Sequence, residues 1–284
     1  MAMEITPTLV IGIGGTGKKV IMEVKRQLYE SYGLISRTAA HDECLGYPVI
    51  DFLCIDADAT DNEKVYANTY DDSLTEASEN VKLKGTEFVA ATIDAQKYNA
   101  YRDNLQGNPY IRNWMPQDVM NANSPAIVAN GAGQHRLFGR LCFFDAFATI
   151  KEAITLKLQK INSAISTQNS WIPHLKPSVS LPSTIRGGTP HYEVHVYIVN
   201  SLAGGTGCGM FLDVSMLIKN LLLSWPNANL DFRVHNIALM PSGYMSVLGD
   251  GKKDRVLANA YAALKEVEFL SLSLIHISEP TRPY

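Results

Sequence analysis

The chain has 284 residues and a formal net charge of −3, with 46% hydrophobic and 19% charged residues. This length is enough to bury the core of one large domain or two small ones. The weak charge gives no electrostatic reason to expect nucleic acid or anionic lipid as a partner. The four cysteines form no C-x-x-C pair and no cluster with histidine at metal-ligand spacing, which argues against a zinc site and suits a cytoplasmic compartment.

Neither the N-terminal segment nor the longest apolar run indicates a membrane protein. The N-terminal segment lacks the basic stretch, apolar core and cleavage site of a secretory signal. The longest apolar run, Met210–Trp225, is interrupted by Asp213 and Lys219 and is shorter than the roughly 18–20 residues that cross a bilayer. We therefore predict no membrane insertion.

The first predicted unit is a strand, a glycine loop and a helix. Thr8–Ile13 has the composition of a buried strand, and Lys18–Tyr32 has apolar residues at helical spacing. Four small residues lie between them: Gly14, Gly15, Thr16 and Gly17. A glycine loop that leads into a helix directs several backbone N–H groups and the positive end of the helix dipole at one point, where anions bind.

Three nucleotide-binding interpretations of this loop remain open. The pattern Gly12-x-Gly14-x-x-Gly17 fits the dinucleotide fingerprint, but the acid expected roughly 20 residues later is missing from that position. The pattern also nearly fits a P-loop, except that Lys19 stands where a magnesium-binding Ser or Thr belongs. The third is a phosphate loop of another nucleotide fold, and a plain tight turn is the structural alternative.

A second strand, Val49–Ile55, is followed by Asp56 and Asp58. Carboxylates at the carboxyl end of a parallel strand can hold a ribose hydroxyl, a nucleobase edge or a water on Mg²⁺. The alternative is ordinary turn chemistry, which aspartate also favours. We predict that one of the two carboxylates contacts the ligand, and we expect no protein ligand bound directly to the metal.

The middle of the chain gives weaker signals. Within residues 61–125 we expect Glu76–Tyr101 to be partly helical and Trp114 to anchor a loop by packing. A third small-residue loop follows, made of Gly131, Ala132, Gly133 and Gln134. It leads into Arg136 and Arg140, which share a helix face if the helix begins this early and then either reach a phosphate or lie in solvent. His135 has no partner in the sequence and is predicted to be a surface or turn residue.

The next segments connect this loop to the most distinctive part of the chain. Phe143–Ile165 is predicted to be one long helix, and Ser166–His191, rich in proline and small polar residues, is predicted to be a surface loop. The β-branched and aromatic run Val194–Val199 predicts a buried strand. A glycine-dense loop comes next and leads into an apolar helix that begins near Met210; the loop residues are Ala203, Gly204, Gly205, Thr206, Gly207, Cys208 and Gly209.

After this helix we predict a strand at Asp231–Met240, a turn that contains Pro241 and Ser242, and an amphipathic helix at Asp254–Leu270. The tail, residues 271–284, does not continue the pattern. It resembles the translation of a sequencing adaptor, which would make it a non-native end, and a genuine disordered terminus is the alternative.

The loop Ala203–Gly209 closely resembles the signature small-G-G-T-G-[S/A]-G of tubulin and FtsZ, with Cys208 where Ser or Ala is usual. The other glycine and acidic loops follow in the order found in those proteins. The phrase GAGQHRLFGR, with the opening GIGGTG, resembles most the bacterial tubulin-like family of operon proteins. The resemblance covers about Thr8–Leu270, and residues 1–270 would then be the nucleotide-binding N-terminal half of a longer protein.

This resemblance implies an α/β fold, Rossmann-like, with a mostly parallel sheet and helices on both faces. It implies GTP or GDP with Mg²⁺ as ligand, bound by residues 14–17, 56, 58, 131–134, 203–208, 241 and 242, with a looser match of residues 250–253 to a ribose contact. It also implies a self-assembling cytoplasmic filament, with partners encoded in the same operon as a further expectation. Hydrolysis would come from an acidic loop after a long central helix, which is not among these residues, so no catalytic residue is assigned.

Two other functions remain open from the sequence. A Rossmann-type, NAD-dependent oxidoreductase would explain GIGGTG but leaves the loop at residues 203–209 without a role. A non-catalytic scaffold would keep both loops as structural remnants. Nucleotide binding separates the three hypotheses.

Overall fold

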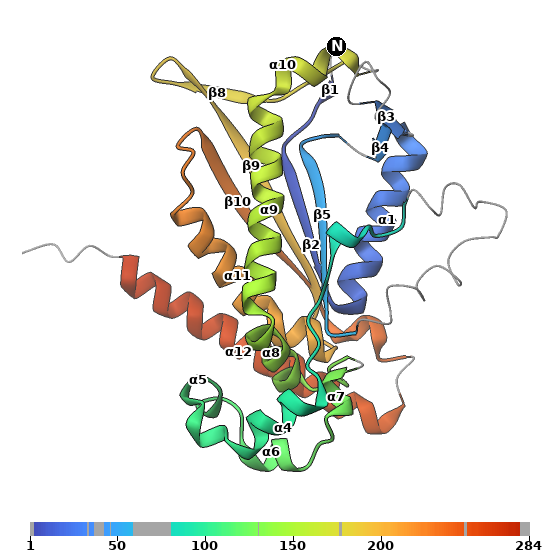
Figure 1. The fold of residues 1–284 in the computed structure, drawn as a ribbon, viewed down its shortest axis with the longest axis vertical. Helices are drawn as coiled ribbons and strands as arrows, with labels where there is room; N and C mark the ends of the chain where they lie inside the picture. Colours follow the sequence, from blue (N-terminus) through green and yellow to red (C-terminus); the bar gives the residue numbers. More distant parts are fainter. Residues whose placement is uncertain are drawn as a thin grey trace, which may run out of the picture.

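The computed structural model describes residues 3–32, 34–36, 43–45, 47–58, 81–129, 131–175, 178–246 and 249–278. They form the α/β fold expected from the sequence, with a mostly parallel sheet and helices on both faces (Figure 1). The first half contains β1 (Met3–Glu4), β2 (Thr8–Ile13), α1 (Gly14–Tyr32), β3 (Leu34–Ser36), β4 (Glu43–Leu45), β5 (Ile50–Asp56), η2 (Gly85–Glu87), β6 (Phe88–Ala90), α4 (Ala95–Asp103), η3 (Leu105–Gly107), α5 (Pro109–Arg112), α6 (Gln117–Asn121) and α7 (Ala126–Ala129).

The second half supplies the longest helices and two long strands. Its elements are α8 (Arg136–Asp145), α9 (Phe147–Ser166), α10 (Gln168–Trp171), η4 (Ile172–His174), β7 (Val179–Ser180), β8 (Ser183–Arg186), β9 (Thr189–Ser201), α11 (Gly205–Leu223), β10 (Leu230–Leu239), η5 (Pro241–Tyr244) and α12 (Asp250–Ser278). Short strand pairs β1–β7 and β3–β4 lie outside the main sheet.

The main sheet has the strand order β10-β9-β2-β5-β6, and these strands all run parallel, while β8 pairs antiparallel with β9. In the central register, Ile11 lies between Leu53 of β5 and Ile198 of β9. β2 and β5 are almost continuously apolar because both faces of these strands are covered, as is usual in parallel sheets. Because β2, β5 and β9 run parallel, their carboxyl ends lie at the same edge of the sheet.

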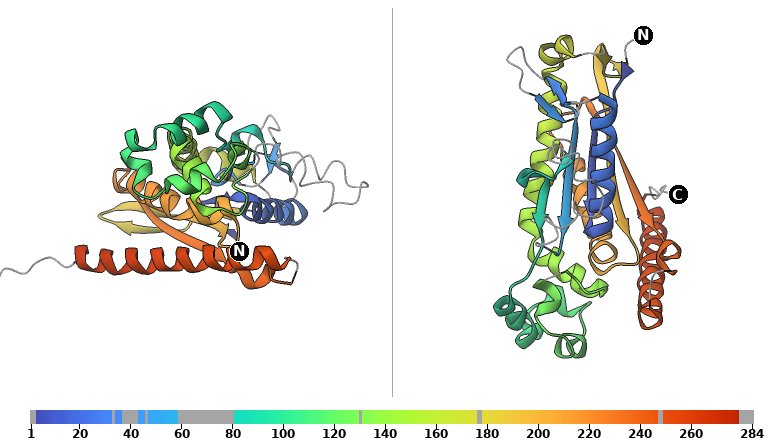
Figure 2. Two further views of the ribbon diagram at one scale, coloured as in Figure 1. Left: turned by 90° about the horizontal axis from the view of Figure 1, so that it is seen from below. Right: turned by 90° about the vertical axis from the view of Figure 1, so that its right-hand side faces the viewer.

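Helices cover the two faces of the sheet unequally (Figure 2). On one face, α1 packs through Ile21 and Met22 against Val10, Phe52 and Val199 of three neighbouring strands. On the other face, α9 and α11 build the larger core together with α8. Residues that contribute to it include Phe138, Ile154, Leu158, Ile161, Met210, Val214 and Ile218. The sheet is thus held from both sides by apolar burial, the main favourable term in folding.

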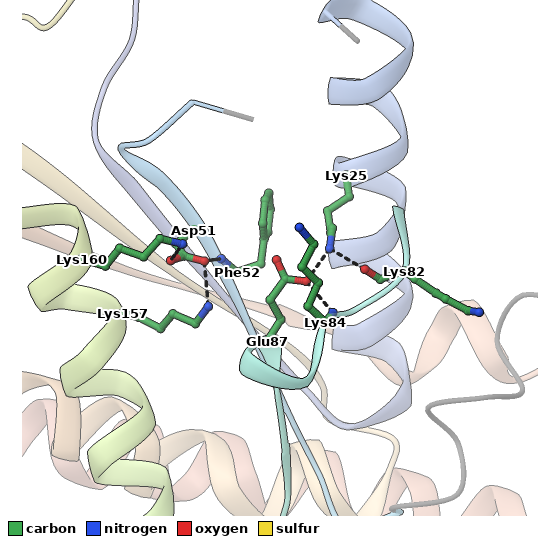
Figure 3. A network of polar contacts seen from close by, with 8 residues as sticks. All are labelled: Lys25, Asp51, Phe52, Lys82, Lys84, Glu87, Lys157 and Lys160. Carbon is green, nitrogen blue, oxygen red and sulfur yellow. Dashed lines mark hydrogen bonds and ion pairs between the residues drawn. The ribbon is translucent and has the colours of Figure 1, made fainter. Parts of the chain in front are cut away.

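Two groups of buried charges flank the sheet (Figure 3). On the α1 side, Lys25 Nζ lies 2.5 Å from Glu87 Oε2 and donates to the carbonyl of Lys82 at 2.9 Å. On the α9 side, Asp51 of β5 receives Lys157 Nζ at 2.8 Å and Lys160 Nζ at 2.7 Å. Glu87 and Asp51 are therefore each matched by at least one ammonium group from a neighbouring element.

These partners set the charge states. Burial lowers the pKa of Lys25, and the nearby Glu87 carboxylate opposes that effect. Burial alone would raise the pKa of Asp51, but the charges and hydrogen bonds of Lys157 and Lys160 outweigh it, so the pKa of Asp51 is lowered. Asp51 is consequently held ionised as a link between β5 and α9.

Several sequence predictions of element boundaries were wrong. The helix expected at Phe143–Ile165 is two helices, α8 and α9, which meet at Ala146. The loop expected at residues 166–191 contains α10, β7 and the β8–β9 hairpin, whose turn has two glycines at positive φ, Gly187 and Gly188. Such glycine turns favour a hairpin over an open loop. The last helix, α12, extends from Asp250 to Ser278, beyond the predicted bounds at both ends.

Among the described residues, one helix, α11, is long and apolar enough to pass a composition test for a membrane span. Half of that window is buried inside the fold, and α11 packs on β9 and α8, as the core helix of a globular domain does. The cysteines of β5 and α8, Cys54 and Cys142, are buried, and burial raises the pKa of the Cys142 thiol to about 12.

Candidate functional site

The candidate site lies where the strand order changes direction. From β2 the chain proceeds to β5 and β6 on one side, whereas β9 and β10 lie on the other side. Ligands of open α/β sheets bind at such a switch point, outside the carboxyl ends of the strands. Here that point is between Ile13, the last residue of β2, and Ser201, the last residue of β9.

Two helices begin at this point. α1 starts at Gly14, directly after β2, and α11 starts at Gly205, four residues after β9 ends. The sequence predicted these glycine segments as loops before the helices, but they largely form the helices' first turns. The first backbone N–H groups of a helix have no partner within it and carry the positive end of its dipole. Two such ends therefore face one small volume.

The two first turns enclose a cavity of about 150 Å³ together with the loop before α8. None of its described lining residues carries a charged side chain. They are Ile13, Gly14, Gly15, Thr16, Ala132, Gly133, Gln134, Ser201, Gly204, Gly205, Thr206 and Gly207. Pockets that enclose a whole small ligand measure roughly 300–1,000 Å³, so this cavity suits part of a ligand, such as a phosphate group.

Close backbone approach explains why glycine is required at two of these positions. Gly14 has φ +70°, a conformation that costs other residues about 1–2 kcal/mol, and a Cβ there would lie 3.2 Å from the backbone nitrogen of Gly207. A Cβ on Gly205 would lie 2.7 Å from the carbonyl oxygen of Ala132. Side chains at these positions would separate the three segments, so glycine keeps the cavity small.

The loop before α8 is tied to its neighbours by backbone hydrogen bonds. Gly131 N–H donates to Ala57 O at 3.0 Å, which joins this loop to the end of β5. Within the described ranges, Gln134 is the one non-glycine residue with a positive φ, 65°. Such a conformation costs about 1–3 kcal/mol and persists only where surrounding contacts hold it.

Eight of the predicted site residues do not line the cavity. Gly17 has a packing role, since a Cβ there would lie 2.5 Å from Val199 O of β9. Asp56 is only 3% exposed, and Asp58 donates its N–H to the Asp56 carboxylate at 3.4 Å. The others are Gly131, Ala203, Cys208, Pro241 and Ser242, the last two in η5 after β10. Gly17, Gly131, Ala203 and Cys208 are sequence neighbours of lining residues, whereas Asp56, Asp58, Pro241 and Ser242 belong to segments that do not line the cavity.

Two lining residues, Ile13 and Ser201, were absent from the sequence prediction. Both are the last residue of a strand that precedes a glycine segment, and that position was the available signal. Ser201 Oγ also accepts the N–H of Ala203 at 3.1 Å, which shapes the turn between β9 and α11.

The basic residues near the loops point elsewhere. Arg136 and Arg140 do share a face of α8, but Arg136 pairs with Glu266 of α12 and Arg140 pairs with Asp213 of α11. The Lys18 ammonium lies over the Phe88 ring, 5.7 Å from its centroid. That position does not suit the phosphate-binding lysine of a P-loop.

His135 and Trp114 are held by packing. The His135 ring is half-buried and lies edge-on to Phe138, with 5.8 Å between ring centroids. Burial, with a smaller contribution from the Arg255 charge, lowers the pKa of His135, which favours a neutral imidazole beside the cavity. Trp114 donates its indole N–H to Tyr110 O at 2.6 Å and lies under the Arg140 guanidinium, as expected of a packing anchor.

A larger cavity of about 530 Å³ lies between α9 and β6. Its lining is mostly apolar and includes Phe88, Val89, Ala153 and Leu156. The element that begins there is η2, a single 3₁₀ turn that starts at Gly85, and the two lysines of the cavity, Lys157 and Lys160, already pair with Asp51. The smaller cavity is therefore the better candidate for binding a phosphate-bearing ligand.

The parallel sheet, the switch-point cavity and the two glycine first turns define a domain of the tubulin/FtsZ GTPase type. The family described as "Tubulin like" matches residues 9–280. The chain therefore belongs to the tubulin-like family.

Two solved structures are similar to the chain over 92% of its length. CetZ from Methanosaeta thermophila strain DSM 6194 is 15% identical, with a TM-score of 0.43. The GDP-bound monomer of CetZ1 from Haloferax volcanii is 12% identical, with a TM-score of 0.38. The chain spans 42% and 47% of those two chains. None of the curated proteins compared with this chain matches it.

Proposed function

We propose that this chain is a GTP-binding module of a self-assembling, tubulin-like cytoskeletal or scaffold protein. The observation that carries the proposal is the shared cavity: Thr16 and Thr206, from first turns far apart in the sequence, line the same small volume. Membership of the tubulin-like family supports guanine nucleotide as the ligand. Bacterial origin, a cytoplasmic location and partners from the same operon belong to the proposal as well.

The residues of the cavity fit a phosphate group. Main-chain N–H groups of residues 14–16 and 204–207, which line the cavity, would hold the phosphates, and Thr206 would add a hydroxyl donor. This uncharged lining relies on amide dipoles in the same way as other glycine-rich phosphate sites. Gln134 or an amide of Ala132 or Gly133 would face the γ-phosphate, because these residues close the third side of the cavity.

The nucleoside and the metal would lie outside the cavity. Asp56 or Asp58 would hold a water on Mg²⁺ or part of the nucleoside, and Pro241, Ser242 and residues 250–253 would lie along the ribose. When bound, Mg²⁺ would neutralise part of the phosphate charge. The activity of the whole protein, including GTP hydrolysis and filament formation, belongs to the same proposal.

Calorimetry with GTP, GDP, ATP and NADH, each with Mg²⁺, tests the ligand. We expect GTP and GDP to bind and NADH not to bind. Tight NADH binding would instead favour the oxidoreductase, and no binding at all would favour the scaffold. Sedimentation with and without GTP then tests nucleotide-dependent assembly.

A further inference from the structure

We propose that Asn259 of α12 is a positioning residue that holds two phosphate loops at a fixed separation and transmits nucleotide occupancy to α12. This inference rests on the proposed nucleotide site and concerns its regulation. It starts from a side chain that lies behind the cavity, since Asn259 is 6% exposed and does not line it.

The carboxamide of Asn259 bridges the two loops. Its Nδ2 donates to Gln134 O at 2.7 Å and lies 3.4 Å from Ala203 O. Both partners are carbonyl oxygens, which only accept, so the amide nitrogen must be the atom that faces them. Gln134 precedes α8 and Ala203 precedes α11, so one side chain fixes the distance between the loops that begin these helices.

The contact also bears on the strained residue of the site. Gln134 lines the cavity with a positive φ, and its carbonyl is the shorter of the two contacts of Asn259. An unfavourable backbone conformation persists only where its surroundings hold it in place. Removal of the donor would let Gln134 relax and would change the side of the cavity proposed to face the γ-phosphate.

Two further contacts attach α12 to the helix starts. The Cys208 thiol, in the first turn of α11, lies 3.3 Å from Asn259 O and donates to it. Arg136, the first residue of α8, forms a two-point ion pair with Glu266. The part of α12 from Asn259 to Glu266 is thus joined to the first turn of α11, which lines the cavity, and to α8, whose preceding loop lines it.

Beyond Glu266, α12 is mostly exposed, and among residues 267–272 only Leu270 is half-buried. A cleft of about 370 Å³ lies between α11 and α12, lined in part by Leu212, Met216, Phe269 and Leu270. Figure 1 shows α12 running past the cavity end of the sheet and continuing away from α11. A helix attached at the loops and separated further along responds to a change in the loops. We therefore expect nucleotide to alter the exchange protection of α12.

The Asn259→Asp variant is the sharpest test, because it keeps the side-chain shape and replaces the donor with a carboxylate that repels both carbonyl oxygens. We expect GTP with Mg²⁺ to bind at least tenfold more weakly than to the wild type. At saturating GTP, the nucleotide-dependent protection of residues 250–266 from hydrogen exchange should disappear. Asn220→Asp, on the exposed face of α11, makes the same charge change and should behave as wild type.

Asn259→Ala is the second variant, because it removes the hydrogen bond without adding a charge. It should weaken GTP binding roughly fivefold, the size of one hydrogen bond, and should also abolish the response of α12. The inference is overturned if the wild type binds GTP and both variants keep wild-type affinity and protection. It is also overturned if GTP binding leaves α12 exchange unchanged in the wild type. A wild type that binds no nucleotide overturns the proposed function itself.

Discussion

Two polar regions at the main sheet use opposite chemistry. Around β5, a buried carboxylate is matched by ammonium groups: Asp51 pairs with the buried Lys157 and with Lys160, whose side chain is half-exposed. At the ends of β2 and β9, the cavity lining contains no charged side chain among the described residues, and its polar groups are backbone, hydroxyl and amide groups. Both regions lie on the same sheet, so the difference reflects their roles. The first has its partners within the chain, whereas the second is the site at which we propose that a phosphate group binds.

Substitutions in the two regions should therefore have different effects: one region should affect stability and the other should affect ligand binding. Removal of one charge from a buried pair leaves the other charge desolvated, which costs stability. Removal of a cavity donor leaves the fold intact but takes an interaction from the ligand. Variants in the two regions can therefore test whether stability and binding are separable here.

The largest effect is expected from Asp51→Asn, which leaves the buried Lys157 ammonium without its carboxylate. We expect unfolding free energy to fall by about 3–5 kcal/mol, measured by urea denaturation, while GTP affinity of the folded fraction stays unchanged. Asp231→Asn removes an exposed pair with Arg186 and should cost less than about 1 kcal/mol. Equal losses in the two variants would contradict a structural role for the buried group.

The contribution of Asp51 to stability should also be measurable in the wild type, as a loss of stability at acidic pH. The pKa of Asp51 is lowered in the folded state, so the unfolded state binds the proton more readily. The stabilisation from Asp51 is complete above its unfolded pKa of roughly 3.9 and is lost as pH falls through the lower folded value. Thermal unfolding between pH 5 and 2, compared for wild type and Asp51→Asn, should show a shallower acid decline in the variant; parallel curves would exclude Asp51 as the cause.

In the other region, Gly205→Ala should damage binding more than folding. The added methyl would meet Ala132 O at 2.7 Å and push apart two sides of the cavity. We expect GTP affinity to fall by about 100-fold, equivalent to roughly 2.7 kcal/mol, with a stability cost of about 1–3 kcal/mol. Gly85→Ala is the matched control, because nothing lies within 4 Å of a Cβ at that position. An unchanged Kd in Gly205→Ala would contradict the assignment of the cavity.

The cavity region could be predicted from the sequence to a greater extent than the region of buried charges. The fold class, the strands around Ile11 and Ile198 and the convergence of the glycine segments follow from local apolar patterns and loop spacing. The buried charges do not. Lys25 and Glu87 are 62 residues apart, and nothing in their local sequence distinguishes them from surface residues. Their pairing depends on how η2 packs against α1, which is tertiary information.

The same limit explains the misplaced site residues. Sequence spacing identified which loops gather at the sheet edge, but not which atoms each loop presents. Arg136 and Arg140 follow a loop that resembles a phosphate-binding loop, yet they pair with acidic residues on α12 and α11 and not with the cavity. Gly17 matches the motif as well as Gly14 does, but its missing side chain serves the packing of α1 on β9.

The smallest predicted effect, Thr206→Val, separates backbone from side-chain contributions within the cavity. Valine keeps the shape of threonine and removes only the hydroxyl, so the proposed backbone contacts remain. We expect GTP to bind roughly fivefold to tenfold more weakly, which corresponds to one hydrogen bond, and unfolding free energy to change by less than about 1 kcal/mol. Thr184→Val on the exposed strand β8 should alter neither quantity. If Thr206→Val abolished binding altogether, one hydroxyl would dominate the site. The contrast between a cavity of amides and a region of paired charges would then no longer explain how this domain recognises an anion.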